Sequence, residues 1–158
     1  MVLKTSLLAL SFFVSLQAIA AVTALTVQPS SSEVRFTAVG TPSALKIKGS
    51  GAKPSGRLEA QGEDLQGDLT ISLADFTTGI ALRDRHLKEK YLEISKPEYS
   101  MAVLSVKKLS KACVLEAKAE TCGFEGSLTL HGKTQPVSGT AKVKKDGGGY
   151  LAEATFSL

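Results

Sequence analysis

Residues 124–143 read FEGSLTLHGKTQPVSGTAKV, and two short strand-like runs flank a turn in this stretch. In both runs, Phe124 to Leu130 and Val137 to Val143, apolar side chains alternate with polar or small ones, as in a β-strand with one wet face. Gly132-Lys133 lies between the runs and gives the backbone the freedom that a tight turn needs. The stretch therefore predicts two neighbouring strands joined by a turn.

The same period of two residues recurs along the chain. It is clearest in DLTISL at residues 68–73, and it also marks residues 32–38, 45–48, 101–106 and 113–117. Turn chemistry separates these segments at Gly49-Ser50-Gly51, Gly62-Glu63-Asp64 and residues 146–149. Many short strands without strand–helix–strand alternation predict an all-β fold, either an antiparallel barrel or a sandwich.

One segment departs from this rhythm. Residues 83–91, RDRHLKEKY, are charged, contain no glycine or proline, and place Leu87 and Tyr91 four residues apart. This spacing predicts a short helical crossover with a narrow apolar stripe, and Asp84 is the expected N-cap.

The N-terminus is laid out like a secretory signal peptide. Lys4 precedes an apolar run from Leu7 to Leu16, and Ala18-Ile19-Ala20 offers the small-residue pattern at which such peptides are cleaved. We expect residues 1–20 to direct export and to be removed, which leaves one domain at residues 21–158.

The charge balance argues against nucleic-acid binding. Nineteen basic residues face 15 acidic ones, but the lysines are dispersed and tryptophan is absent, whereas nucleic-acid binding needs a concentrated basic face. Transient contact with an anionic membrane surface stays open, as does a homodimer.

The two cysteines, Cys113 and Cys122, are nine residues apart in a chain expected to reach an oxidising compartment. Their spacing is not C-x-x-C, which favours a structural disulfide over a redox pair. Two free buried thiols remain the alternative.

No catalytic machinery stands out, and we expect no enzyme, metal or cofactor. The two histidines, His86 and His131, have no further ligands at strand or helix spacing. A hydrolase built on the acidic residues Asp64, Asp68 and Asp75 is the weaker alternative, because scattered carboxylates usually face water.

The period-two faces carry the candidate apolar lining of a binding site. These side chains fill either a solid core or the wall of a small cavity, since barrels of about eight strands allow both; they are Val34, Phe36, Leu69, Ile71, Leu73, Phe124, Leu128 and Leu130. Arg83 and His86 either pair locally and face water or form a polar rim for an anionic or carbonyl head group.

Three stretches resemble the YceI-like family, in the right order. Residues 78–87, TGIALRDRHL, followed by Pro97, are similar to its T-G-…-R-D-x-H-L pattern. Residues 126–137, GSLTLHGKTQPV, are similar to G-x-L-T-x-H-G-x-T-x-P-V, and residues 32–36, SEVRF, to the S-x-V-x-F strand near the family's start.

This resemblance implies an extended, lipocalin-like antiparallel β-barrel in the periplasm, with an elongated apolar cavity for polyisoprenoid chains or similar lipid-like amphiphiles. Phe36, Leu128 and Leu130 would face the interior; Arg83, Asp84 and His86 would lie in the helical crossover, and His131 at a hairpin turn.

The sequence departs from the family's pattern in two places. Thr37-Ala38-Val39-Gly40 lacks the histidine that is common after the first strand. The chain also stops at Leu158, where further strands are implied. Residues 155–158 are therefore expected to open a strand that is cut short, so that the barrel is left open along one side.

The function expected from these patterns is a periplasmic carrier of isoprenoid or other long apolar ligands. The alternative is an accessory protein-interaction module of an envelope-stress or membrane redox system.

Overall fold

A computed structural model of the chain describes residues 24–39, 46–116 and 121–158. Most of them lie in strands: β1 (Ala24–Val27), β2 (Val34–Val39), β3 (Lys46–Ala52), β4 (Pro54–Gln61), β5 (Asp64–Ser72), β6 (Met101–Leu109), β7 (Thr121–Leu130), β8 (Lys133–Asp146) and β9 (Gly149–Phe156). The helical segments are η1 (Pro29–Ser31), η2 (Leu73–Asp75), α1 (Ala81–His86), the π-helical turn η3 (Leu87–Tyr91), η4 (Pro97–Tyr99) and α2 (Lys111–Glu116). The expected signal peptide lies outside the described residues.

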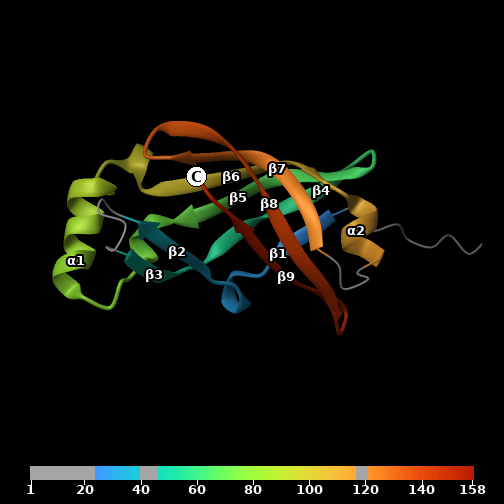
Figure 1. Ribbon diagram of the computed structural model, residues 1–158, viewed down its shortest axis with the longest axis horizontal. Helices are drawn as coiled ribbons and strands as arrows, with labels where there is room; N and C mark the ends of the chain where they lie inside the picture. The colour runs from blue at the N-terminus through green and yellow to red at the C-terminus, as the bar shows by residue number, and fades with distance from the viewer. Residues whose placement is uncertain (1–23, 40–45, 117–120) are drawn as a thin grey trace, which may run out of the picture.

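Seven strands form one antiparallel sheet in the order β1-β4-β5-β6-β7-β8-β9, and β2 pairs with β3 in a separate ribbon. In Figure 1, β4 to β7 run along the long axis of the molecule while β8 and β9 cross them obliquely. The right-handed twist of each strand accumulates across the sheet, which curls into a half-barrel with β1 and β9 at its edges. The expected all-β, barrel-like antiparallel fold is confirmed.

Alternation within the strands sorts the side chains between the two faces. On β5, Leu65 and Ile71 are buried, whereas Gln66 and Asp68 are exposed. On β6, Ala102, Leu104 and Val106 are buried. The apolar side chains meet on the inner face and form a single core cluster, to which β2 also contributes.

The helical crossover lies at one end of the molecule (Figure 1). It begins two residues earlier than expected, at Ala81, and the expected N-cap at Asp84 is wrong because Ile80 holds that position. Asp84 is instead the fourth helical residue and bonds back to the preceding loop.

Two further local predictions are wrong. Residues 113–117 were expected to form a strand, but α2 extends to Glu116, because a short apolar run does not distinguish a strand from a helix. Gly49-Ser50-Gly51 does not end a strand, since β3 continues to Ala52. A β-carbon at Gly49 would collide with the ring of Phe36, so this glycine serves packing rather than a turn.

The pattern also missed β1 and β4 and misplaced the start of β9. Thr155 and Phe156 end that strand rather than open one. Within the described ranges, no helix has the length and apolar character needed to cross a bilayer.

The disulfide between Cys113 and Cys122 is present, with Cα atoms 5.9 Å apart. It joins helix α2 to strand β7, because Cys113 lies in a helix and not in the strand expected at residues 113–117. Cys122 is 2% exposed and belongs to the core cluster, so the bond fixes α2 to the inner layer at the end of the molecule opposite α1 (Figure 1).

Candidate functional site

The structure brings all eight expected lining residues into one apolar cluster on the inner face of the half-barrel. Four of them are buried (Ile71, Leu73, Phe124 and Leu128), and four are half-buried (Val34, Phe36, Leu69 and Leu130). Seven lie on strands, and Leu73 lies in η2 directly after β5. Their role as a ligand wall stays a prediction.

Small residues opposite large ones set the shape of this inner face. The ring of Phe36 covers Gly49 and meets Phe76 edge-on, with ring centroids 5.1 Å apart. The ring of Phe124 packs against Gly139 on β8. A β-carbon at Gly49 would overlap the Phe36 ring, and one at Gly139 would overlap the backbone oxygen of Thr155 as well as the Phe124 ring, so a side chain at either position would displace its neighbours.

The inner face is only partly covered along β9. Ala152 pairs with Val143 and Ala154 pairs with Ala141. Cross-strand partners point to the same face of a sheet, and both β8 partners are buried. Ala152 and Ala154 nevertheless remain exposed, so apolar inner surface is accessible beside the core.

Arg83 and His86, the expected polar rim, both lie on α1. Arg83 is half-buried and His86 is exposed. Within the described part of the chain, neither side chain makes a hydrogen bond or ion pair with another residue. The local pairing considered for this cluster therefore involves Asp84 alone, and Arg83 keeps its donors available.

The carboxylate of Asp84 fixes the loop that precedes α1. It accepts hydrogen bonds from the Thr77 hydroxyl (2.6 Å) and from the Thr78 amide (2.6 Å) and hydroxyl (2.5 Å). These bonds, led by the one from Thr77, lower the pKa of Asp84 from 3.8 to about 2. The backbone of Thr77 also pairs with Ser50 on β3, so the crossover is tied to the β2–β3 ribbon.

A second polar cluster surrounds His131, which lies in the β7–β8 turn as expected. Its Nε2 donates a hydrogen bond to Glu93 Oε2 at 2.7 Å, and its ring packs on Tyr99 with centroids 4.2 Å apart. Glu93 also forms an ion pair with Lys96, whose ammonium lies over the Tyr99 ring. Sequence patterns gave no sign of Glu93, because the contact spans 38 residues.

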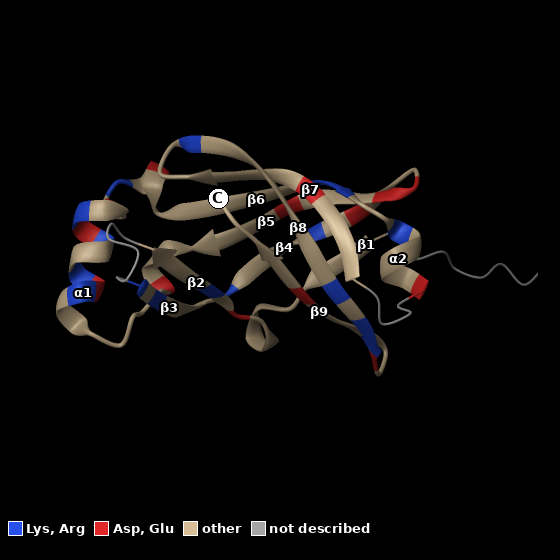
Figure 2. Cartoon of the chain, viewed as in Figure 1, with Lys and Arg blue, Asp and Glu red and all other residues tan. Residues whose placement is uncertain are grey.

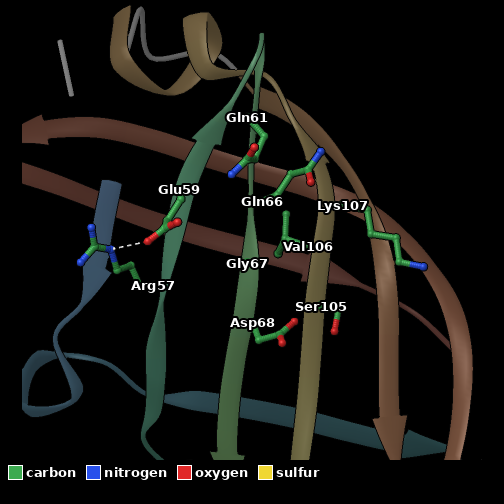
Figure 3. Close-up of a pocket in the computed structure, with 9 residues that line it drawn as sticks. All are labelled: Arg57, Glu59, Gln61, Gln66, Gly67, Asp68, Ser105, Val106 and Lys107. Carbon is green, nitrogen blue, oxygen red and sulfur yellow. Dashed lines mark ion pairs between the residues drawn. The ribbon is translucent and has the colours of Figure 1, made fainter. Parts of the chain in front are cut away.

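A hollow of about 430 Å³ on the described surface lies elsewhere (Figure 3). Arg57 and Glu59 on β4, Asp68 on β5 and Ser105 and Lys107 on β6 contribute to its lining. Arg57 and Glu59 neutralise each other in an ion pair of 3.1 Å. Charged and amide side chains predominate among its lining residues, and none of the eight expected lining residues is among them, so this hollow is not the apolar site that the sequence predicts.

The described residues hold no cluster of three or more His, Cys, Asp or Glu side chains that could bind a metal ion. Asp68 lines the polar hollow of Figure 3, and Asp64 and Asp75 lie at the beginning of β5 and the end of η2. The absence of an enzymatic role stays a prediction.

A curled antiparallel sheet with an apolar inner face and a helical crossover at one end defines a β-barrel-like domain with an apolar interior. Comparison of the sequence with family models matches the YceI-like domain over residues 25–158, and the chain belongs to this family. No curated protein matches the sequence.

Solved structures share the fold. The crystal structure of Burkholderia cenocepacia BcnA is 19% identical, covers 81% of this chain and 77% of its own, and gives a TM-score of 0.63. A polyisoprenoid binding domain from Saccharophagus degradans, implicated in plant cell wall breakdown, is also 19% identical. The match covers 78% of this chain and 68% of that domain's chain, with a TM-score of 0.56.

Proposed function

We propose that this protein is a periplasmic binding protein that carries or sequesters polyisoprenoids or other long apolar amphiphiles. The observation that carries the proposal is the apolar cluster along the inner face, in which half-buried side chains such as Phe36, Leu69 and Leu130 adjoin a buried core. A long apolar chain is the ligand class that such a surface would bind.

One further observation and one energetic argument support the ligand class. The chain shares its fold with a polyisoprenoid binding domain. Burial of an apolar chain contributes about 0.8 kcal/mol per CH₂, so one isoprene unit contributes roughly 2–4 kcal/mol before ordering costs. Affinity should therefore rise with the number of isoprene units buried, without any charged contact.

Export is part of the proposal. It is supported by the signal-peptide pattern of residues 1–20 and by the Cys113–Cys122 disulfide, which suits an oxidising compartment. The intact mass of protein recovered from the periplasm should correspond to a start at or close to Ala21. Recovery of the chain there with Met1 retained contradicts export with cleavage.

The ligand itself is tested by extraction of the purified protein with organic solvent, followed by mass spectrometry. We expect a co-purified isoprenoid or long-chain amphiphile. Titration with a fluorescent polyisoprenyl probe then compares Leu130→Ala with Leu151→Ala, which removes a 52% exposed leucine from β9.

Leu130→Ala should weaken probe binding by about tenfold, because it removes apolar surface from the wall, and Leu151→Ala should leave it unchanged. Equal affinities in both variants, or an empty protein that takes up no probe, would overturn the proposal and favour a protein-interaction module.

A further inference from the structure

The helical crossover carries a surface that the core does not explain. We propose that residues 80–91 dock this end of the protein onto an anionic lipid bilayer. The docking surface consists of Ile80, Leu82, Arg85, Lys90 and Tyr91, and it is separate from the ligand wall proposed above.

Large apolar side chains are concentrated there. Ile80, Leu82 and Tyr91 are 49%, 54% and 72% exposed, and they are three of the seven exposed large hydrophobic residues among those described. Twelve consecutive residues therefore hold almost half of this set. Exposed apolar side chains gathered in one short segment, rather than scattered singly, are typical of an interaction site.

The same segment is basic. Residues 80–91 contain four Lys or Arg and two Asp or Glu, and Figure 2 shows blue segments recurring along this crossover. Arg85 and Lys90 are both exposed. Cationic groups interleaved with leucine and tyrosine are the composition of a helix that lies in a membrane interface, with the apolar tips inserted and the cations at lipid phosphates.

The fold presents this surface rigidly. Asp84 ties α1 to Thr77 and Thr78, as described above, and Thr77 pairs with Ser50. On the far side of the crossover, Leu92 and Ile94 pack against the core cluster. The crossover lies at one end of an elongated molecule (Figure 1), and Ile80, Leu82 and Tyr91 are exposed there, so they are available to a surface that approaches this end.

An anionic bilayer fits these features better than a protein groove. The exposed apolar side chains belong to a helical end of the molecule and not to a strand edge, and the positive charge is complementary to phosphatidylglycerol head groups. Docking at this tip would bring one end of the apolar inner face to the membrane, where long apolar amphiphiles reside.

The test is co-sedimentation of the full chain with lipid vesicles. Vesicles of phosphatidylglycerol and phosphatidylethanolamine should bind the protein at low salt, and added salt should weaken this binding, because the attraction is screened. Vesicles of phosphatidylcholine should bind it much less.

Two double variants separate the contributions. Leu82→Ser with Tyr91→Ser should abolish the salt-resistant part of binding. Arg85→Glu with Lys90→Glu should lower affinity for anionic vesicles by more than twentyfold, since each basic residue near such a surface contributes about fivefold. Matched controls are Leu151→Ser, with a similarly exposed leucine, and Lys142→Glu with Lys144→Glu, with the same change in net charge.

Circular dichroism establishes that each variant is folded, and binding of the polyisoprenyl probe without vesicles should equal that of the wild type, which separates this proposal from ligand binding. Absence of sedimentation with anionic vesicles at low salt overturns it. Equal losses in the charge-reversal variant and its control overturn it as well, because they assign binding to net charge alone, and equal losses in the serine variant and Leu151→Ser overturn it because they assign binding to exposed apolar surface in general.

Discussion

Glu93 and His131 are 38 residues apart and hydrogen-bonded at 2.7 Å, and both have a left-handed backbone, with φ of 48° and 50°. No other described residue except glycine has a positive φ. Such a backbone is unfavourable for a residue with a β-carbon. Two strained positions therefore lie opposite each other, one just after η3 and one in the turn between β7 and β8. The hydrogen bond between them offsets part of the free-energy cost of the strained backbone.

Substitution of Glu93 should separate the hydrogen bond from the backbone strain. Glu93→Ala removes the carboxylate and keeps the strain, whereas Glu93→Gly removes both, because glycine adopts positive φ readily. We expect both variants to melt below the wild type and the alanine variant to melt lowest. Thermal unfolding by circular dichroism checks the order, and an alanine variant that melts at or above the glycine variant contradicts it.

Acid should destabilise the protein through Asp84. Its hydrogen bonds with Thr77 and Thr78 hold its folded-state pKa at about 2, below the ordinary 3.8. A carboxylate whose pKa is lower in the folded than in the unfolded state stabilises the fold at any pH above its unfolded-state pKa. This contribution is lost as the pH falls from about 4 toward about 2. Urea unfolding across this range should show Asp84→Asn less stable than the wild type at neutral pH, with the difference shrinking toward pH 2.

The matched control is Glu89→Gln, an exposed carboxylate on the same crossover. It should follow the wild type through the acid range. A difference between Asp84→Asn and the wild type that stays constant with pH would show that the hydrogen bonds do not depend on the ionised carboxylate.

Removal of the disulfide should lower the free energy of unfolding. A closed ring of about ten residues corresponds to roughly 2.7 kcal/mol by loop entropy. The variant Cys113→Ala with Cys122→Ala should therefore melt roughly 10 °C lower, and reduction of the native protein should approach the same value. Non-reducing peptide mapping establishes the bond, and quantitative labelling of both thiols in non-reduced protein recovered from a periplasmic extract contradicts it.

Alternation predicted those strands whose two faces differ. Residues 68–73 and 124–130 contrast dry and wet side chains directly, so the pattern needs no knowledge of the rest of the chain. Strand β4 was not predicted, because its first residues include Pro54 and Gly56, which are typical of turns. A β-carbon at Gly56 would overlap the carbonyl oxygen of Asp68 on the neighbouring strand, and this close approach becomes visible only in the folded sheet.

Of the candidate site, the apolar part was predictable from the sequence and the polar part was not. The apolar face follows from period two, and its eight residues meet in one cluster. The polar contacts around the site were not predictable from the sequence. Asp84 accepts hydrogen bonds from Thr77 and Thr78 in an irregular loop, and Glu93 accepts one from His131, which lies in a turn 38 residues further along the chain. Contacts of this kind depend on how the sheet curls, and sequence spacing does not specify that.

The last prediction concerns the rim. Arg83 is half-buried and without a partner among the described residues, whereas Arg85, two positions along α1, is exposed. The planar fork of donors on an arginine suits a phosphate head group, so Arg83→Ala should weaken binding of a polyisoprenyl phosphate and leave binding of the matching polyisoprenol unchanged. Arg85→Ala, measured without vesicles, should affect neither ligand. Equal losses for the two ligands in Arg83→Ala would remove Arg83 from the head-group site, since a contact with the apolar chain alone does not distinguish a phosphate from an alcohol.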